Sequence, residues 1–260
     1  MIFTYDTTAV KYTIEGTGPT LLFIHGFLES STMWQSIIPH FKTSHQVITL
    51  DLPGHGESEC MGQTHSMEDF AAVMIGLLDH LQIETATFIG HSMGGYATLA
   101  VAEKHPERIR NLVLLNSSPV ADSPERQLNR ERALQLIPNA KDAFISMAIT
   151  NLFSSENQEK LEHEIHLAKE EAKGYPLEGI LAAIRGMKVR KDRSSSLKSF
   201  KNPKFMICGA EDPILPLTEC KTVANTTDTE LFIVPNGHMS HLEAPSEVVK
   251  KLHFIENICT

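Results

Sequence analysis

The sequence predicts an α/β protein, with a mostly parallel sheet, helices on both faces of that sheet, and an inserted all-helical segment. Short apolar runs rich in β-branched residues alternate with helical patterns along most of the chain, which is typical of strands buried on both faces of a parallel sheet. Between about residues 118 and 200 this alternation stops, and only helical patterns follow one another. A chain of 260 residues can bury the core of one such domain together with its insertion.

Six apolar runs are the expected parallel strands, and each ends near a Gly, Asp or Asn. They lie at residues 20–26, 46–54, 85–92, 111–117, 204–212 and 230–238. Residues 2–7 and 10–18 alternate apolar and polar side chains instead. This alternation predicts an antiparallel hairpin at the edge of the sheet.

Helical patterns lie between these runs. Ser66 begins one of them, over residues 66–81, because Asp69 follows three residues later as in a capping box. A second helix is expected at residues 93–107, with its end marked by Pro106, and a third at 244–257. Strand and helix repeated in this order place helices on both faces of the sheet.

The insertion reads as four helices, at residues 123–137, 140–153, 154–174 and 176–187. Ser155 and Gln158 match a capping box, and residues 190–203 read as a loop that returns to the sheet. We therefore predict a core of residues 1–117 and 201–260 and a helical cap, or lid, of residues 118–200. An insertion at this point would lie over the carboxyl edge of the sheet, where open α/β sheets bind their ligands.

Composition and charge exclude some classes of partner. The net charge of −9 disfavours nucleic acid, whose phosphates attract basic surfaces. No apolar run approaches the ~20 residues that span a bilayer, and the first residues lack the pattern of a secretory signal, so we expect a cytoplasmic protein without an integral membrane segment. In a reducing compartment, free thiols are the expected state of Cys60, Cys208, Cys220 and Cys259.

One short motif carries most of the information about function. Gly90, Ser92 and Gly94 match G-x-S-x-G between an expected strand and an expected helix, which is the arrangement of a serine nucleophile on a sharp turn. Such a turn strains the serine backbone and exposes its Oγ. Side chains two residues away would collide with the neighbouring helix and strand, which explains the two glycines. The N-terminus of the helix adds a positive dipole end beside the serine.

A serine nucleophile needs a base and an acid, in the chain order serine, acid, histidine. Asp212 and His238 each follow an expected strand, so both would lie at the same sheet edge as Ser92. Glu211 is an alternative acid, but the Asp-Pro pair favours a turn that points Asp212 off the strand. His241 is an alternative base, but the residue before His238 is a glycine, which suits a tight exit from the strand.

Two backbone N–H groups are expected to stabilise the oxyanion. One belongs to Met93, the residue after the nucleophile, and the other to Phe27, in the loop after an early strand. Gly26 lets that loop approach a substrate closely. We expect structural hydrogen bonds from three further histidines, His25, His55 and His91.

At this point the sequence resembles the α/β-hydrolase superfamily. The matching segments are HGF at 25–27, DLPGHGES at 51–58, GHSMGG at 90–95, GAEDPILP at 209–216 and GHMSHLEAP at 237–245. The resemblance implies a Ser92–Asp212–His238 catalytic triad, an oxyanion hole from Phe27 and Met93, and a cap domain. Carboxylesterases and lipase-like hydrolases are most similar. Haloalkane dehalogenases and epoxide hydrolases carry an aspartate nucleophile, which Ser92 argues against.

The cap supplies candidates for a substrate pocket. Together with two core residues, they are Leu28, Phe144, Met147, Leu152 and Met239. The cap residues among them would serve equally well as the packing face of the cap itself. His163 and His166 lie in a strongly charged helical pattern, which indicates a solvated face rather than a metal site.

These observations lead to three hypotheses of function. The first is a serine hydrolase that cleaves a carboxylic ester or a related small acyl substrate, with no cofactor and no metal. The second is a lyase of the menaquinone-pathway synthase type, or a cofactor-free haloperoxidase-like enzyme, that uses the same triad. An anionic lyase substrate could then meet Arg185, Lys188 or Arg190. The third is a ligand-binding protein that keeps the fold without turnover.

Overall fold

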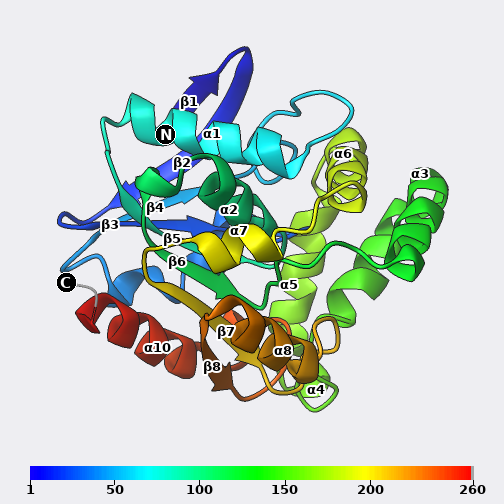
Figure 1. Cartoon of the computed structure of the whole chain (residues 1–260). Helices are drawn as coiled ribbons and strands as arrows, with labels where there is room; N and C mark the ends of the chain where they lie inside the picture. Colours follow the sequence, from blue (N-terminus) through cyan, green and yellow to red (C-terminus); the bar gives the residue numbers. More distant parts are fainter. Residues whose placement is uncertain (259–260) are drawn as a thin grey trace.

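The computed structural model describes residues 1–258 and contains one eight-stranded sheet (Figure 1). The strand order is β1-β2-β4-β3-β5-β6-β7-β8, in which β1–β2 and β2–β4 pair antiparallel and all other pairs are parallel. The bounds are β1 Ile2–Tyr5, β2 Thr8–Glu15, β3 Thr20–Ile24, β4 Gln46–Leu50, β5 Ala86–His91, β6 Ile109–Leu115, β7 Lys204–Gly209 and β8 Glu230–Val234. The expected fold class is confirmed, and the N-terminal hairpin lies at the predicted edge.

Ten α-helices accompany this sheet in the described part of the chain. They are α1 Met67–His80, α2 Met93–Lys104, α3 Pro124–Thr150, α4 Asn157–Lys160, α5 Glu162–Lys173, α6 Leu177–Lys188, α7 Ser194–Ser199, α8 Leu217–Thr227, α9 Ser240–Glu243 and α10 Pro245–Ile258. Ser66 caps α1 in the predicted capping box with Asp69. Between β3 and β4 the chain forms two short 3₁₀ turns, Ser31–Trp34 and Ile38–His40.

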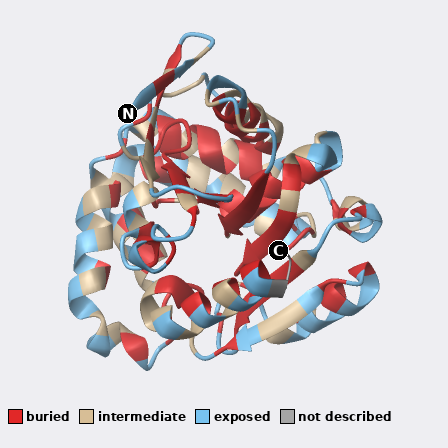
Figure 2. Cartoon of the chain, turned by 90° about the vertical axis from the view of Figure 1, so that its left-hand side faces the viewer, coloured by how far each residue is buried: buried red, intermediate tan, exposed pale blue. Residues whose placement is uncertain are grey.

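The inner strands divide their side chains between two cores, because successive residues of a strand point to opposite faces. In β3, Leu22 and Ile24 belong to a core shared with α1 and α2, whereas Leu21 and Phe23 belong to a core shared with α10 and Trp34. Both faces of these strands are therefore buried (Figure 2). This two-sided burial explains why the strands read as continuous apolar runs.

Four of the inserted helices, α3 to α6, form a group that lies beyond one end of the strands (Figure 1). α3 joins two helices that the sequence predicted separately, with a bend at Ala140 two residues after Pro138. A proline inside a helix removes a hydrogen bond and bends the axis.

Two expectations for the insertion are wrong. Ser155 does not cap a helix: α4 begins at Asn157, and Gln158 donates to backbone carbonyls instead. Residues 190–203 are not only a loop, because they contain α7, which packs against α2 and α8 rather than against the other inserted helices. The buried Arg193 precedes α7 and pairs with Glu68 and Glu103, which holds α7 against the core.

The backbone of α6 touches the core directly at two glycines. A Cβ on Gly179 would lie 2.6 Å from the Cα of Gly54, and a Cβ on Gly186 would overlap the carbonyl of His65. The amide of His65 also donates to the carbonyl of Ala182 over 3.0 Å. These contacts fix where α6 lies above the sheet.

Across residues 1–258, none of the helices combines the length and the apolar character needed to cross a membrane.

We expect Gly186→Ala to lower the free energy of unfolding by about 1–3 kcal/mol, because the added methyl group forces α6 away from the His65 backbone. Urea denaturation followed by circular dichroism measures the change. Gly174→Ala is the matched control, since a Cβ there meets only the Glu171 carbonyl, at 3.1 Å. Equal stability of the two variants would contradict the direct contact.

Candidate active site

Ser92 lies on a sharp turn between β5 and α2. Its backbone has φ 48° and ψ −112°, a region that residues other than glycine rarely adopt. A Cβ on Gly90 would lie 2.6 Å from the Gly94 carbonyl, and a Cβ on Gly94 would lie 2.5 Å from the Ile24 carbonyl. The steric explanation of the two motif glycines is therefore confirmed, and the strain is held by backbone contacts on both sides of Ser92.

Three side chains from distant parts of the chain meet at this turn. His238 Nε2 lies 2.9 Å from Ser92 Oγ, and His238 Nδ1 lies 2.7 Å from Asp212 Oδ2. Both His238 and Asp212 are buried. Asp212 follows β7 and His238 follows β8, so the parallel sheet places both at the carboxyl edge next to Ser92, as the sequence predicted.

Asp212 is fully held by hydrogen bonds. Its Oδ1 accepts from the amides of Ile214 and Leu215, at 2.8 and 2.9 Å, and its Oδ2 also accepts from Asn116 Nδ2 at 2.9 Å. Burial alone would raise the pKa of Asp212, but the interaction with His238 and these hydrogen bonds lower it below its usual value. The carboxylate therefore stays ionised. The neighbouring Glu211 is exposed and does not take this position.

His238 is held by the inserted segment as well as by the core. The His238 amide donates to the Leu152 carbonyl over 3.1 Å, and Glu243 accepts from both the Met239 amide and the Ser154 amide. The alternative base, His241, is fully buried, and burial lowers its pKa to about 3. It is therefore a neutral ring away from Ser92 Oγ.

The loop after β3 lies against the nucleophile. A Cβ on Gly26 would lie 2.9 Å from His91 Nδ1 and 3.2 Å from Ser92 Cβ, so a glycine suits this close approach. Phe27 follows in the loop and Met93 begins α2, and these are the two residues whose amides were expected to bind an oxyanion. His25 accepts from the Leu52 amide with Nε2, and its Nδ1 lies 2.7 Å from the Gly26 carbonyl. This ring has the expected structural role.

A buried charge pair joins the three loops of the site. His91 Nδ1 lies 2.8 Å from Glu29 Oε2, and His91 Nε2 lies 3.0 Å from the backbone carbonyl of His238. Glu29 Oε2 also accepts from the Gly26 amide. Both atoms that face the His91 ring can only accept hydrogen bonds, so both ring nitrogens carry a proton and the ring is a cation.

Each member of this pair stabilises the charged form of the other. Burial alone would lower the pKa of His91, but the attraction of Glu29 outweighs it and raises the pKa above its usual value. Burial would raise the pKa of Glu29, but the charge of His91 lowers it to about 2. Asp212, His238 and His241 also face this ring.

A cavity of about 450 Å³ opens above Ser92 and His238, between the core and the inserted helices. Leu28, Phe144 and Leu152 line it, as expected. The predictions for Met147 and Met239 are wrong. Met147 lies on the solvent side of α3 and is 54% exposed, whereas the Met239 side chain is buried in the apolar core.

The cationic residues expected at the cavity have other contacts. Arg185 donates to the Gln63 carbonyl, Lys188 pairs with Glu131, and Arg190 is buried. The cavity is instead lined by Arg126 and Arg130 of α3.

Comparison with known proteins identifies the family. The model of the alpha/beta hydrolase fold matches residues 19–245. The chain belongs to the α/β-hydrolase family. It is 29% identical to 3-oxoadipate enol-lactonase 2 of Acinetobacter baylyi, over 93% of this chain and 91% of that protein. It is 28% identical to the dihydrolipoyllysine-residue acetyltransferase component of the acetoin cleaving system of Pseudomonas putida, over 90% of this chain but 62% of that protein.

Solved structures show the same likeness. A thermophilic esterase from Thermogutta terrifontis, with malate bound, superposes with a TM-score of 0.92 at 29% identity, covering 97% of this chain and 95% of the esterase.

Among the described residues, one group of side chains is spaced closely enough to hold a metal ion. The group consists of Glu29, His91 and His241, which each offer one ligand atom, and these atoms lie within 4.8 Å of one another. Because both His91 nitrogens carry protons, that ring offers no lone pair to a cation.

Two cysteines in the core, Cys208 and Cys220, and the half-buried Cys60 are free thiols, as expected. Cys259 lies outside the described residues.

Sequence reasoning missed two residues that hold the site, Asn116 and Glu29. Asn116 follows β6 with a φ of 46°, and asparagine tolerates this left-handed region. Its position directly after an expected strand was a usable signal. Glu29 has no comparable signal, because its partner His91 is 62 residues away in the sequence.

We expect Glu29→Gln to lower the pKa of His91, because the buried ring loses the carboxylate that compensates for its desolvation. Two-dimensional ¹H–¹⁵N NMR of the histidine side chains measures the protonation of the ring. At about pH 6 the wild-type ring should be doubly protonated and the variant ring neutral. Glu57→Gln removes an exposed carboxylate that pairs with Lys11 and should leave His91 unchanged. A neutral wild-type His91 at this pH would contradict the assignment.

The same pair predicts a pH dependence of stability. Because the pKa of His91 is raised by folding, its contribution is complete below about pH 6.5 and decreases as the pH rises through the raised value. The contribution of Glu29 is complete above about pH 4.3 and decreases as the pH falls towards about 2. Urea denaturation from pH 3 to 9 should therefore show that the free energy of unfolding of the wild type exceeds that of Glu29→Gln most clearly between about pH 4.3 and about pH 6.5. A constant difference across the range would contradict this.

Proposed function

We propose that this α/β-hydrolase is a serine hydrolase that cleaves a carboxylic ester or a related small acyl substrate through an acyl-enzyme intermediate. The observation that carries the proposal is the continuous line of contacts from Ser92 Oγ through His238 to Asp212, at 2.9 and 2.7 Å. This line opens into the cavity between core and insertion. The enol-lactonase and the esterase among its relatives support the choice of an ester or lactone bond.

The proposed reaction has two halves. Ser92 Oγ attacks the carbonyl carbon while His238 Nε2 takes the hydroxyl proton, and Asp212 stabilises the resulting imidazolium. The amides of Phe27 and Met93 stabilise the oxyanion. His238 then donates the proton to the leaving alkoxide, which departs as the alcohol. Water attacks the acyl carbon while His238 Nε2 takes a proton from it. The bond from the acyl carbon to Ser92 Oγ then breaks, His238 returns the proton to Ser92 Oγ, and the acid is released.

The His91–Glu29 pair acts beside this machinery in the proposed mechanism. It binds the backbone carbonyl of His238 and the Gly26 amide with opposite charges, so it holds the base and the oxyanion loop at fixed positions relative to Ser92. Preorganised groups of this kind need no rearrangement during the reaction.

We expect Ser92→Ala to reduce turnover of 4-nitrophenyl butyrate by about 10³-fold or more, because the variant cannot form the acyl-enzyme. A spectrophotometric assay measures the release of 4-nitrophenol, and equal thermal stability of the variant shows that its fold is intact. Ser117→Ala is the matched control: it removes a nearby hydroxyl that donates to the Ser92 carbonyl and should keep most of the activity. Near-normal turnover by Ser92→Ala would reject the proposal.

Mass spectrometry of the intact protein, quenched in acid during turnover, distinguishes the hydrolase from a lyase and from a ligand-binding protein. An acyl adduct on Ser92 is expected of the hydrolase. A lyase that uses His238 only as a base forms no adduct, and a ligand-binding protein shows no turnover.

A further inference from the structure

Two arginines of α3 line the cavity, although the chain as a whole carries a net charge of −9. Arg126 and Arg130 are four residues apart and therefore lie on the same face of the helix. Asn129 lies between them and also lines the cavity. Both arginines are half-buried, so their side chains pass along the wall of the cavity rather than extending into bulk water.

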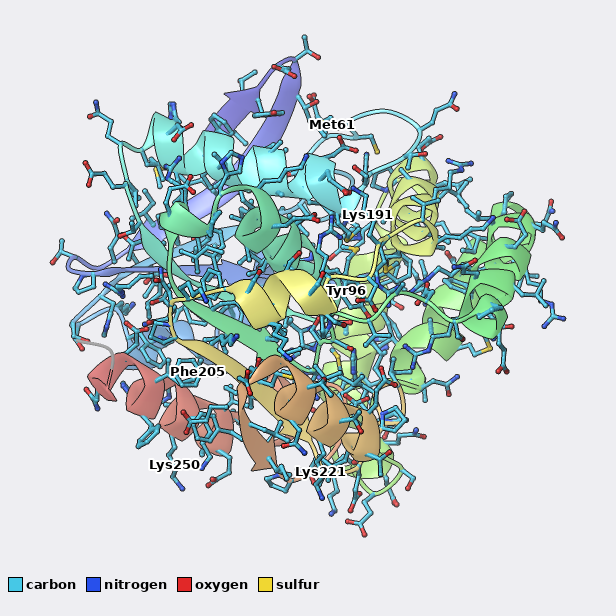
Figure 3. All side chains as sticks on the ribbon, viewed as in Figure 1. Met61, Tyr96, Lys191, Phe205, Lys221 and Lys250 are labelled. Carbon is cyan, nitrogen blue, oxygen red and sulfur yellow. The ribbon has the colours of Figure 1, made fainter. Side chains whose placement is uncertain are left out.

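The charges around these arginines do not cancel. Arg130 and Arg190 both pair with the buried carboxylate of Asp122, and the guanidinium of Arg190 also lies 4.0 Å from the centre of the Tyr96 ring, on the side of α2 towards the inserted helices (Figure 3). Arg126 donates to the backbone carbonyl of Ile214 and has no carboxylate partner among the described residues. Two guanidinium groups thus share one carboxylate and the third has none, which leaves an excess of two positive charges.

Among the residues that the structure describes, no other charge of the cavity lining compensates for this excess. Within that set Glu29 is the only carboxylate lining the cavity, and the cationic His91 already neutralises it. Each guanidinium has five N–H donors. The hydrogen bonds from Arg126 to Ile214 and from Arg130 to Asp122 use one of these donors each, so most donors of both groups remain for a ligand.

Apart from these arginines, much of the cavity lining is apolar. It includes Phe27, Leu28, Phe144, Leu152, Ile184 and Met187. Such a lining binds a short hydrocarbon chain, whereas the guanidinium groups bind a carboxylate in a planar, bidentate geometry. A ligand that fits both regions has an apolar middle and one anionic end.

We propose that Arg126 and Arg130 form an anion subsite, and that the substrate is a carboxylate-bearing ester or lactone, such as a half-ester of a dicarboxylic acid. This inference rests on the proposed function and specifies its substrate class. The scissile carbonyl lies at Ser92, a chain of a few carbons lies along the apolar walls, and the free carboxylate lies at the two arginines.

Two substrates of equal carbon number test the subsite. The mono-4-nitrophenyl ester of adipic acid ends in a carboxylate, and 4-nitrophenyl hexanoate ends in a methyl group. We expect wild-type kcat/KM to be about 10-fold or more higher for the adipate, because a charge-assisted hydrogen bond is made with only one of the two. Added salt should reduce this preference, since it screens partly exposed charges.

Substitution of the arginines assigns the preference to the subsite. Arg126→Gln and Arg130→Gln should each lower kcat/KM for the adipate by about 10-fold and change the rate with hexanoate by less than about 2-fold. The hexanoate rate also reports any disturbance of the Asp212 loop, which Arg126 contacts through Ile214. Arg132→Gln is the matched control: it removes an exposed arginine of the same helix, bonded to Asn129, and should leave the ratio of the two substrates unchanged.

Binding to the Ser92→Ala variant keeps this test independent of turnover. Calorimetry should show that monomethyl adipate binds at least ~10-fold more tightly than methyl hexanoate, and that adding Arg126→Gln removes the difference. If neither ester is hydrolysed but this difference is found, the proposed function fails and the anion subsite stands. Equal affinity and equal kcat/KM for the charged and neutral partners would overturn the subsite.

Discussion

The close backbone approach of β5 and α2 at Ser92 is the constraint on which the rest of this site depends. Gly90 and Gly94 bring main-chain atoms so near one another that no side chain fits. The serine between them consequently adopts a left-handed, strained conformation. That conformation presents Oγ to the sheet edge where the loops after β7 and β8 end. A relaxed backbone at residue 92 would leave Asp212 and His238 in contact with each other but without a hydroxyl to act on.

Buried charge holds the loops around this turn. Asp212 is ionised among donors from Asn116 and its own loop, and the His91–Glu29 pair connects the nucleophile turn, the loop after β3 and the backbone of His238. Removing one member of such a pair leaves the other charge buried alone, which is more costly than losing both. Separating the loops would leave a buried charge without its partner, so these pairs hold the loops in one relative position. Arg126 and Arg130 lie beside this network in the cavity wall, and Arg126 contacts the Asp212 loop through the Ile214 carbonyl.

The sequence predicted the sheet and the meeting of Ser92, Asp212 and His238, because these features depend on local signals. Buried strands read as apolar runs, and in a parallel sheet the residues that follow them converge on one edge. The features that were missed depend on tertiary contacts. Which α3 side chains point into the cavity depends on how the helix is oriented on each side of the bend at Ala140. Arg126 and Phe144 line the cavity, whereas Met147 faces solvent. The serine-rich start of α7 reads as a loop, and its helix forms against α2 and α8.

Labelling with a fluorophosphonate tests most directly whether Ser92 is an activated nucleophile. The probe bonds covalently to a serine oxygen whose proton a neighbouring base removes, and peptide mass spectrometry locates the adduct. The account predicts a single adduct on Ser92, formed rapidly in the wild type and far more slowly in His238→Gln. No adduct on Ser92, or equal labelling rates with and without the imidazole, would contradict it.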